Sequence, residues 1–303
     1  MTKLFLFESG STKTTLLVRS IGTELRNSEK IHEINLSGYN PNRNSLAFLM
    51  ELKNLEIFPT AEDEVCFYGS GLASSQRKDE LKAVFRAQFH IEIAVSDDIL
   101  GAARALFKKE SGVFAIMGTG GVVGYYNGEC VTTRRGGYGY LIDDLGGAYE
   151  LGKRVVSAWL NGDLPQALQN EIESLFDTDR NSFTSIYYND PHLGARPEGL
   201  KKVADTVKLI AAYQETEAVI FLLENYFTTF FKQHIITLCE NKGVKELKIC
   251  GSPAEVFHES IQKIAANFGL IIKEKLRYPA LNLLDYHLNE ISLRKKKKKI
   301  EVL

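Results

Sequence analysis

The sequence lacks the features that mark membrane, nucleic-acid-binding and disulfide-rich proteins. No apolar run approaches the roughly 18 residues that a membrane-spanning helix needs, so no membrane partner is expected. Basic and acidic residues number 37 and 38, and a formal net charge of -1 gives no field that would attract nucleic acid. The apolar stretch at residues 4–7 is too short for a secretory signal. The four cysteines are scattered without a CxxC pair, which predicts reduced thiols in the cytoplasm and neither disulfides nor a zinc site: Cys66, Cys130, Cys239 and Cys250.

The sequence does contain the alternation of strands and helices that is typical of an α/β protein, and its 303 residues suggest about two domains. An expected strand at residues 4–7 leads through a turn of small residues into a second strand at 15–19. The same order of strand, Gly-rich turn and returning strand begins again at 113–126, and Asn127-Gly128 then marks a hairpin turn. We therefore predict an internal duplication in which each half opens on a hairpin.

Periodicity and capping residues predict the remaining elements. Apolar spacing predicts helices at 75–89, 98–108, 199–213, 215–240 and 254–268, and strands at 65–68, 91–95, 247–250 and 271–276. Asp97 or Asp98 can cap the second of these helices. The lysine run at 295–299 predicts that residues 291–303 form a basic, disordered tail.

The turns of the two predicted hairpins have a composition suited to phosphate. Glycines let backbone N–H groups approach phosphate oxygens closely, and serine and threonine hydroxyls add further donors. The turn at residues 8–14 lacks the Gly-Lys-Ser/Thr ending of a P-loop and leads into a strand, so a P-loop is excluded. Two such turns at matching places in duplicated halves favour a nucleotide-binding site.

Several ordered motifs resemble the N-acetylglucosamine kinase-like family, which includes the BadF/BadG/BcrA/BcrD ATPases and belongs to the actin-like ATPase superfamily. The motifs are Glu8-Ser9-Gly10-Ser11-Thr12-Lys13-Thr14, Gly118-Thr119-Gly120, Gly136-Gly137-Tyr138-Gly139-Tyr140 and Cys250-Gly251-Ser252. The resemblance covers about residues 4–287 and implies two actin-like (ribonuclease H-like) domains, 1–111 and 112–290, with a nucleotide cleft between them. It also implies a kinase that uses ATP and Mg²⁺ to phosphorylate an amino sugar, N-acetylglucosamine or a relative, at the 6-hydroxyl. Related kinases are often dimers, so a homodimer is one assembly that the resemblance implies.

Carried over position by position, the resemblance assigns roles to individual residues. The ATP and phosphate contacts fall on Gly10, Ser11, Thr12, Lys13, Gly118, Thr119, Gly120 and Gly251. Asp98 matches the catalytic base, while Asp97 competes with it for that role and for the helix cap. Glu8 stands where the family positions magnesium. The sugar contacts fall on Asn40, Gly71, Tyr138 and Asp144.

Four departures from the family pattern leave two alternatives to the kinase open. Glu8 replaces an aspartate, Gly121 and Val122 replace a Ser-Asn pair, Leu145 replaces a glutamate, and residues 191–196 replace a Pro-Asn-Arg-Phe-Leu-Ala segment. The first alternative is a sugar or nucleotide sensor of the same fold with weakened catalysis. The second is an ATPase activator of a radical dehydratase, which would hold an iron–sulfur cluster through cysteine. The scattered cysteines, which fall in predicted strands or in a helix, favour the first alternative over the second.

Overall fold

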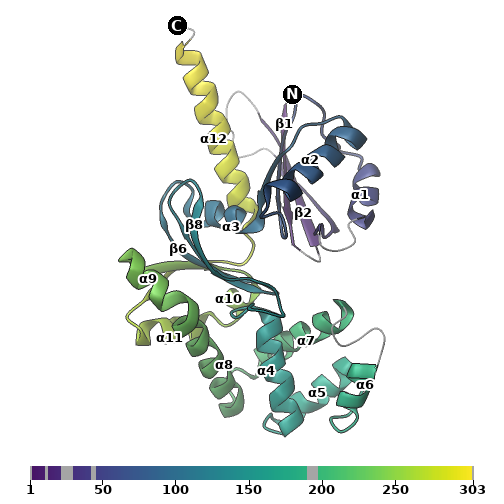
Figure 1. Ribbon diagram of the computed structural model, residues 1–303, viewed down its shortest axis with the longest axis vertical. Helices are drawn as coiled ribbons and strands as arrows, with labels where there is room; N and C mark the ends of the chain where they lie inside the picture. The colour runs from purple at the N-terminus through teal and green to yellow at the C-terminus, as the bar shows by residue number, and fades with distance from the viewer. Residues whose placement is uncertain (1, 11–12, 22–29, 42–45, 190–196, 302–303) are drawn as a thin grey trace. The chain divides into compact units, whose positions relative to one another are not determined.

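The computed structural model describes residues 2–10, 13–21, 30–41, 46–189 and 197–301. The contacts divide the chain into two compact units, residues 1–109 with 279–303, and residues 110–278. Each unit is built on one five-stranded sheet of mixed direction with helices packed on it, so the predicted α/β class is confirmed (Figure 1).

The first unit contains the sheet β3-β2-β1-β4-β5. Its strands are β1 (Lys3–Ser9), β2 (Lys13–Ser20), β3 (His32–Ser37), β4 (Glu64–Gly69) and β5 (Ala94–Asp97). The first three strands pair antiparallel, whereas β4 runs parallel to both β1 and β5. Because β1, β4 and β5 are parallel neighbours, their carboxyl ends meet at one edge of the sheet, and this edge carries several of the predicted site residues.

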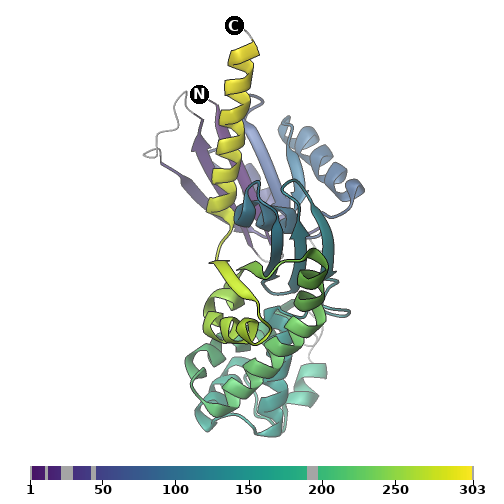
Figure 2. The same ribbon diagram turned by 90° about the vertical axis from the view of Figure 1, so that its left-hand side faces the viewer.

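Helices cover both faces of this sheet, which explains why β1 reads as an uninterrupted apolar run. Phe5 and Phe7 pack in a cluster with side chains of α1 (Leu46–Lys53) and α2 (Ser75–Phe89). Leu4 and Leu6 alternate with them and are also fully buried. Two further helices contact β1, namely α3 (Asp98–Phe107) and α12 (Ala280–Glu301) (Figure 2).

A polar group around Tyr68 ties β4 to α3 and α12. The Tyr68 hydroxyl accepts a hydrogen bond from Nη1 of Arg104 at 2.6 Å and lies 2.8 Å from Nε2 of His287. Burial lowers the pKa of His287 to about 4, so this imidazole is neutral near pH 7. A Cβ at Gly101 would lie 2.9 Å from the Tyr68 ring, so glycine lets α3 approach β4 closely.

The C-terminal segment differs from its prediction in two ways. The domain boundary at 290 placed residues 279–290 in the second half, but they belong to the first unit. Residues 291–303 were predicted as a disordered tail, yet α12 continues to Glu301. The reason is an apolar stripe at helical spacing, since Leu283, Leu284, Leu288 and Ile291 are all buried. Lysine is a good helix former, so the run that follows extends the helix.

The second unit repeats the layout of the first with the sheet β10-β9-β6-β7-β8. Its strands are β6 (Gly112–Met117), β7 (Gly121–Tyr126), β8 (Val131–Gly136), β9 (Glu246–Cys250) and β10 (Ile271–Leu276). Again three strands pair antiparallel, and β9 runs parallel to both β6 and β10. The matching strand order and directions confirm the predicted internal duplication.

The second unit has a larger set of helices than the first. They are α4 (Ala148–Asn161), α5 (Gln166–Phe176), α6 (Phe183–Asn189), α7 (Pro197–Ile210), the 3₁₀ helix η1 (Ala211–Tyr213), α8 (Glu217–Phe230), the π-helix η2 (Phe231–Ile235), α9 (Ile236–Lys242), α10 (Ser252–Val256) and α11 (His258–Asn267). Trp159 on α4 and Phe227 on α8 are fully buried in its core cluster. Within the described residues, no helix has the length and apolarity that a bilayer crossing requires.

Candidate functional site

The hairpin β1–β2 is held by a buried pair of hydroxyls. Oγ of Ser9 lies 2.6 Å from Oγ1 of Thr14, and it accepts a hydrogen bond from the backbone N–H of Tyr39 at 2.9 Å. The N–H of Gly10 donates to the carbonyl of Lys13 at 2.9 Å and closes the turn. Ser9 and Thr14 therefore stabilise the hairpin. The sequence alone did not show whether these hydroxyls contact a ligand or each other. The predicted phosphate contacts Ser11 and Thr12 lie outside the described residues.

Three carboxylates gather where β1, β4 and β5 end. The register places Glu8 opposite Tyr68 on β4, and the next residue of β4, Gly69, lies opposite Asp97 on β5. Burial, together with the charges of Asp97 and Glu8, raises the pKa of Asp98 to about 6. The pKa of Glu8 is raised by burial, against the lowering effect of Lys13.

Asp97 and Asp98, which the sequence left as competitors, have different surroundings. A carboxylate oxygen of Asp97 accepts a hydrogen bond from the backbone N–H of Leu100 at 2.7 Å, so Asp97 is the N-cap of α3. Asp98 is the first residue of the helix and has the strongly raised pKa. The capping role thus falls on Asp97.

The structure brings together two of the predicted sugar contacts, Asn40 and Gly71. A Cβ built on Gly71 would lie 2.8 Å from Oδ1 of Asn40, and the φ of Gly71 is +78°, a conformation that favours glycine. Asn40 follows Tyr39, whose backbone bonds Ser9. The N–H of Ser70 donates to the carbonyl of Ser9 at 2.9 Å. Both candidates are therefore fixed to the end of β1.

The second hairpin, β6–β7, is braced by the turn that precedes α4. The carbonyls of Gly118 and Thr119 accept hydrogen bonds from the N–H groups of Ala148 and Tyr149 at 2.8 and 3.0 Å. A Cβ on Gly147 would lie 2.3 Å from the carbonyl carbon of Gly120, so backbone packs directly on backbone here. The N–H of Gly118 closes its own turn by donating to the carbonyl of Gly120 at 3.0 Å.

Two of the four departures from the family pattern, at Gly121-Val122 and at Leu145, lie beside this hairpin. A Cβ on Gly121 would lie 2.1 Å from the carbonyl oxygen of Leu145, so no serine fits there without a backbone shift. Val122 contacts Gly137, whose Cβ would lie 2.8 Å from the valine Cβ. Leu145 is buried in the core cluster of the unit. Each of these three residues thus fits its surroundings, and the turn of the hairpin is preserved.

Asp144 is a predicted sugar contact that lies against the hairpin β6–β7. A Cβ on Gly120 would be 2.7 Å from Cγ of Asp144, so the carboxylate covers that glycine. Burial raises the pKa of Asp144 to about 6. Tyr138 is on the same loop but is exposed, and its ring lies 5.1 Å from the guanidinium carbon of Arg134. The structure thus places Asp144 against the hairpin and Tyr138 against Arg134.

Gly251 completes the group of glycines in the second unit. Its φ is +109°, and a Cβ there would lie 2.1 Å from the carbonyl oxygen of Met117 and 3.3 Å from the nitrogen of Gly118. Only glycine allows this approach of β9's end to β6's end. Gly118, Thr119, Gly120 and Gly251, all predicted nucleotide contacts, therefore lie side by side.

Sequence reasoning missed two residues that support this loop. The hydroxyl of Tyr226 on α8 accepts a hydrogen bond from the N–H of Gly146 at 2.9 Å and donates to the carbonyl of Gly147 at 2.7 Å. Nε2 of His234 lies 3.2 Å from Oδ1 of Asp143. Tyr226 lies on α8 and His234 on η2, about 80–90 positions from the residues they contact, and the apolar periodicity of this segment gave no sign of them.

Glu8 is the carboxylate at the end of β1 that could hold magnesium together with phosphate oxygens. No group of three or more His, Cys, Asp or Glu side chains within the described residues is arranged to hold a metal ion. Magnesium usually keeps several waters and takes only one or two protein carboxylates together with phosphate oxygens. Glu8 and Asp98 are two interacting, desolvated carboxylates of this kind, and Glu8 is the one not assigned to proton transfer.

Comparison with known proteins identifies the fold. No family model matches the sequence, and no curated protein matches it. Among solved structures, a candidate N-acetylglucosamine kinase from Porphyromonas gingivalis is 23% identical with a TM-score of 0.75, covering 95% of this chain and 99% of that one. A candidate N-acetylglucosamine kinase from Chromobacterium violaceum is 15% identical with a TM-score of 0.70, covering 94% and 99%. A ROK-family glucokinase from Streptomyces griseus, solved with glucose and AMPPNP, is 12% identical with a TM-score of 0.55, covering 94% and 98%.

At these identities the likeness shows the fold alone, which this chain shares with the two candidate N-acetylglucosamine kinases and with the ROK-family glucokinase. The fold class that the sequence predicted is thereby confirmed. The likeness extends over nearly the full length of each solved chain.

Proposed function

We propose that this protein is an ATP-dependent sugar kinase that phosphorylates the 6-hydroxyl of an amino sugar, N-acetylglucosamine or a relative. The observation that carries the proposal is Asp98, a desolvated carboxylate with a raised pKa beside Glu8 at the end of β1. The fold supports it, because two solved chains of the same fold are candidate N-acetylglucosamine kinases and a third was solved with glucose and an ATP analogue.

Asp98 would act as the general base. With a pKa of about 6 it is mostly ionised at pH 7, and it is a stronger base than an ordinary aspartate. It would take the proton of the sugar hydroxyl as that oxygen attacks the γ-phosphorus, while the bond from phosphorus to the bridging oxygen breaks and ADP leaves. The cap formed by Asp97 fixes the first turn of α3 and so holds Asp98 in place.

The hairpin turns would hold the phosphates through backbone N–H groups. In the second unit the N–H of Gly118 is used within its turn, and the described contacts leave those of Thr119 and Gly120 for phosphate oxygens. In the first unit the N–H of Gly10 is likewise used within its turn, so Gly10 would serve by leaving room for the phosphates, together with Ser11, Thr12 and Lys13. Glu8 would hold Mg²⁺, which when bound would neutralise charge on the phosphate oxygens.

The sugar would be oriented by side chains near these turns. Asn40 can donate and accept hydrogen bonds, and its contact with Gly71 fixes its position. Asp144 would accept a hydrogen bond from a sugar hydroxyl. Tyr138, an exposed aromatic ring, would stack on a face of the sugar ring.

The experiment is ADP release with ATP and Mg²⁺ over N-acetylglucosamine, N-acetylmannosamine, N-acetylmuramic acid, glucosamine and glucose. Asp98→Asn should lose transfer, by about 100-fold or more, and still bind ATP. Asp97→Asn is the matched control, because asparagine also caps helices and the substitution removes the same charge. We expect this control to keep most of the activity.

The outcomes separate the remaining possibilities. Turnover of one sugar that Asp98→Asn abolishes supports the kinase and names its substrate. Wild-type turnover in Asp98→Asn would overturn the assignment of the base. Binding of sugar or ATP in calorimetry without turnover of any sugar would contradict the kinase and support a sensor of the same fold.

A further inference from the structure

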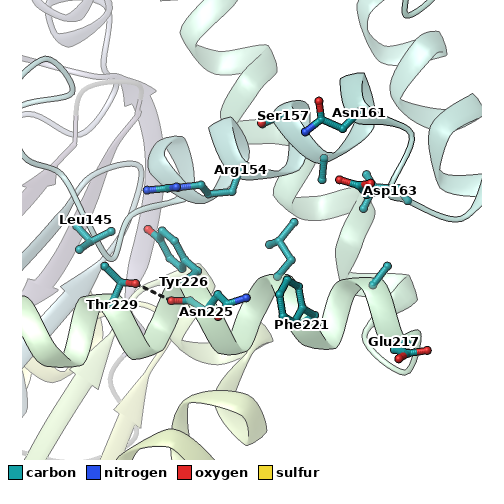
Figure 3. Close-up of a pocket in the computed structure, with 14 residues that line it drawn as sticks. Leu145, Arg154, Ser157, Asn161, Asp163, Glu217, Phe221, Asn225, Tyr226 and Thr229 are labelled. Carbon is teal, nitrogen blue, oxygen red and sulfur yellow. Dashed lines mark hydrogen bonds between the residues drawn. The ribbon is translucent and has the colours of Figure 1, made fainter.

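The second unit contains a pocket of about 600 Å³ between α4 and α8, outside the group of predicted site residues (Figure 3). Most of its wall is apolar, with Ala158 and Leu164 on the α4 side and Phe221 and Leu222 on α8. Its volume is in the range of roughly 300–1,000 Å³ that is usual for small-molecule sites, which are mostly apolar with a few polar groups.

The pocket has a cationic end formed by Arg154. In Figure 3 the guanidinium extends from α4 toward Leu145 and Tyr226. Arg154 forms no ion pair or hydrogen bond with any described residue, although its neighbour Lys153 pairs with Glu150. The two carboxylates of the lining, Asp163 and Glu217, lie toward the opposite end in the same view.

The middle of the pocket offers an aromatic face and amides. The side chain of Phe221 is 69% exposed, so the helix leaves a large ring uncovered in the lining. Asn225 on α8 and Asn161 on α4 also line the pocket, and their amides can donate and accept hydrogen bonds. An arginine left without a carboxylate partner, close to apolar walls, suits a ligand with one anionic group and an apolar body.

We propose that this pocket binds a small organic anion with an apolar body, a carboxylate or a phosphate monoester. Arg154 binds the anionic group, and Phe221 and Leu222 cover the apolar part. The site is separate from the predicted phosphate turns, and its occupation does not depend on the proposed kinase activity.

The pocket shares two walls with the turn that braces the second hairpin. Tyr226 lines the pocket with its ring and bonds Gly146 and Gly147 through its hydroxyl. Leu145, which directly precedes Gly146 in that turn, also lines the pocket. Because Gly147 packs on Gly120, a ligand that fixes Tyr226 also stabilises the hairpin. A ligand in this pocket should therefore also tighten nucleotide binding at the hairpin, a consequence that rests on the proposed function.

Binding is tested with four probes on the full chain by titration calorimetry and NMR. Phenyl phosphate and 3-phenylpropionate carry an anion on an apolar body, 3-phenylpropanol lacks the charge, and inorganic phosphate lacks the body. We expect the two anions with a body to bind about tenfold or more tightly than the other two probes, since a charge-assisted bond contributes about 1.5 kcal/mol or more. The stronger of the two anions identifies the class of headgroup.

Two variants locate the binding. Arg154→Gln should weaken both anionic probes about tenfold and remove the advantage over 3-phenylpropanol. Lys201→Gln removes one exposed positive charge from α7, outside the pocket, and should leave all affinities unchanged. Equal binding of neutral and anionic probes, or unchanged binding in Arg154→Gln, would overturn the proposal.

Sedimentation and hydrogen exchange complete the test. If the chain sediments as a dimer that Phe221→Ser dissociates, a second copy covers this face and the proposal is wrong. Slower exchange of the Ala148 and Tyr149 amides in the presence of phenyl phosphate supports the connection to the hairpin. Unchanged exchange of these amides with the pocket occupied would refute that connection. Neither readout requires turnover, so failure of the kinase assay leaves this test intact.

Discussion

Gly121 offers the sharpest test of how the second hairpin is built. The family pattern has serine at this position, so Gly121→Ser restores the expected residue. In this chain the added Cβ would lie 2.1 Å from the carbonyl oxygen of Leu145 and 2.7 Å from the backbone nitrogen of Gly147. Both obstacles are backbone atoms and cannot be relieved by a change of rotamer. Restoring the family residue should therefore damage the protein.

The expected size follows from the cost of overpacking. Backbone shifts forced by added atoms cost about 1–3 kcal/mol, which for a domain of this size lowers Tm by about 3–9 °C. Displacing the Leu145 carbonyl also moves the turn that bonds Gly118 and Thr119, so nucleotide binding at the hairpin should weaken together with stability. Thermal and urea unfolding measure the first effect, and calorimetry with an ATP analogue measures the second.

Gly118→Ala is the matched control for stability. A Cβ there would lie 3.8 Å from the carbonyl oxygen of Gly120, which is an ordinary van der Waals contact, and the position has no positive φ. This variant should unfold within about 0.5 kcal/mol of the wild type. If Gly121→Ser unfolds at the temperature of Gly118→Ala, the backbone packing of Gly121 on the Leu145–Gly147 turn does not constrain this site, and our explanation of the departure fails.

Three further predictions concern the first unit. The kinase rate should fall as the pH drops through about 6, because Asp98 must be ionised to accept a proton. The same raised pKa means that protonation of Asp98 stabilises the folded state, fully below pH 3.8 and no longer above about pH 6. Asp98→Asn should therefore raise Tm at pH 8. Tyr68→Phe removes the hydroxyl that contacts Arg104 and His287, so it should lower the free energy of unfolding in urea by about 1–3 kcal/mol. Tyr278→Phe, at a ring that is 64% exposed, should change this free energy very little. Leu284→Ala, at a fully buried side chain of α12, should lower the free energy of unfolding by about 2–5 kcal/mol in the same measurement. Leu293→Ala, at a side chain that is 53% exposed, should change it very little, and similar losses of stability for the two variants would contradict the packing of α12.

Local patterns predicted most of the fold because each depends on neighbouring residues. The hairpins follow from apolar strands flanking small-residue turns, and the second was predicted at 113–126, where β6 and β7 lie. The cap of α3 follows from an aspartate placed before an apolar helix, although the sequence alone did not separate Asp97 from Asp98. That distinction depends on the Leu100 N–H and on the charge of Glu8, which comes from a distant strand.

The C-terminus shows where local reasoning failed. A run of lysines resembles a solvated tail, and charge alone gives no reason to fold it. The helix α12 forms because Leu284 and Leu288, upstream of the run, are buried in the first unit, whose other residues are 1–109. Composition could not show this contact, because the partner surface comes from β1, β2 and α3.

The packing around Tyr226 explains why two of the departures, at Gly121 and at Leu145, occur together. The turn at 145–147 presses backbone against Gly120 and Gly121, so serine is excluded at 121, and the turn is held in that position by the Tyr226 hydroxyl from α8. Leu145, which stands where the family pattern has glutamate, is buried in the core cluster of the same unit. Gly121 packs against the Leu145 carbonyl, Val122 packs against Gly137, and the N–H groups of Ala148 and Tyr149 bond the hairpin, so the altered residues leave its turn in place.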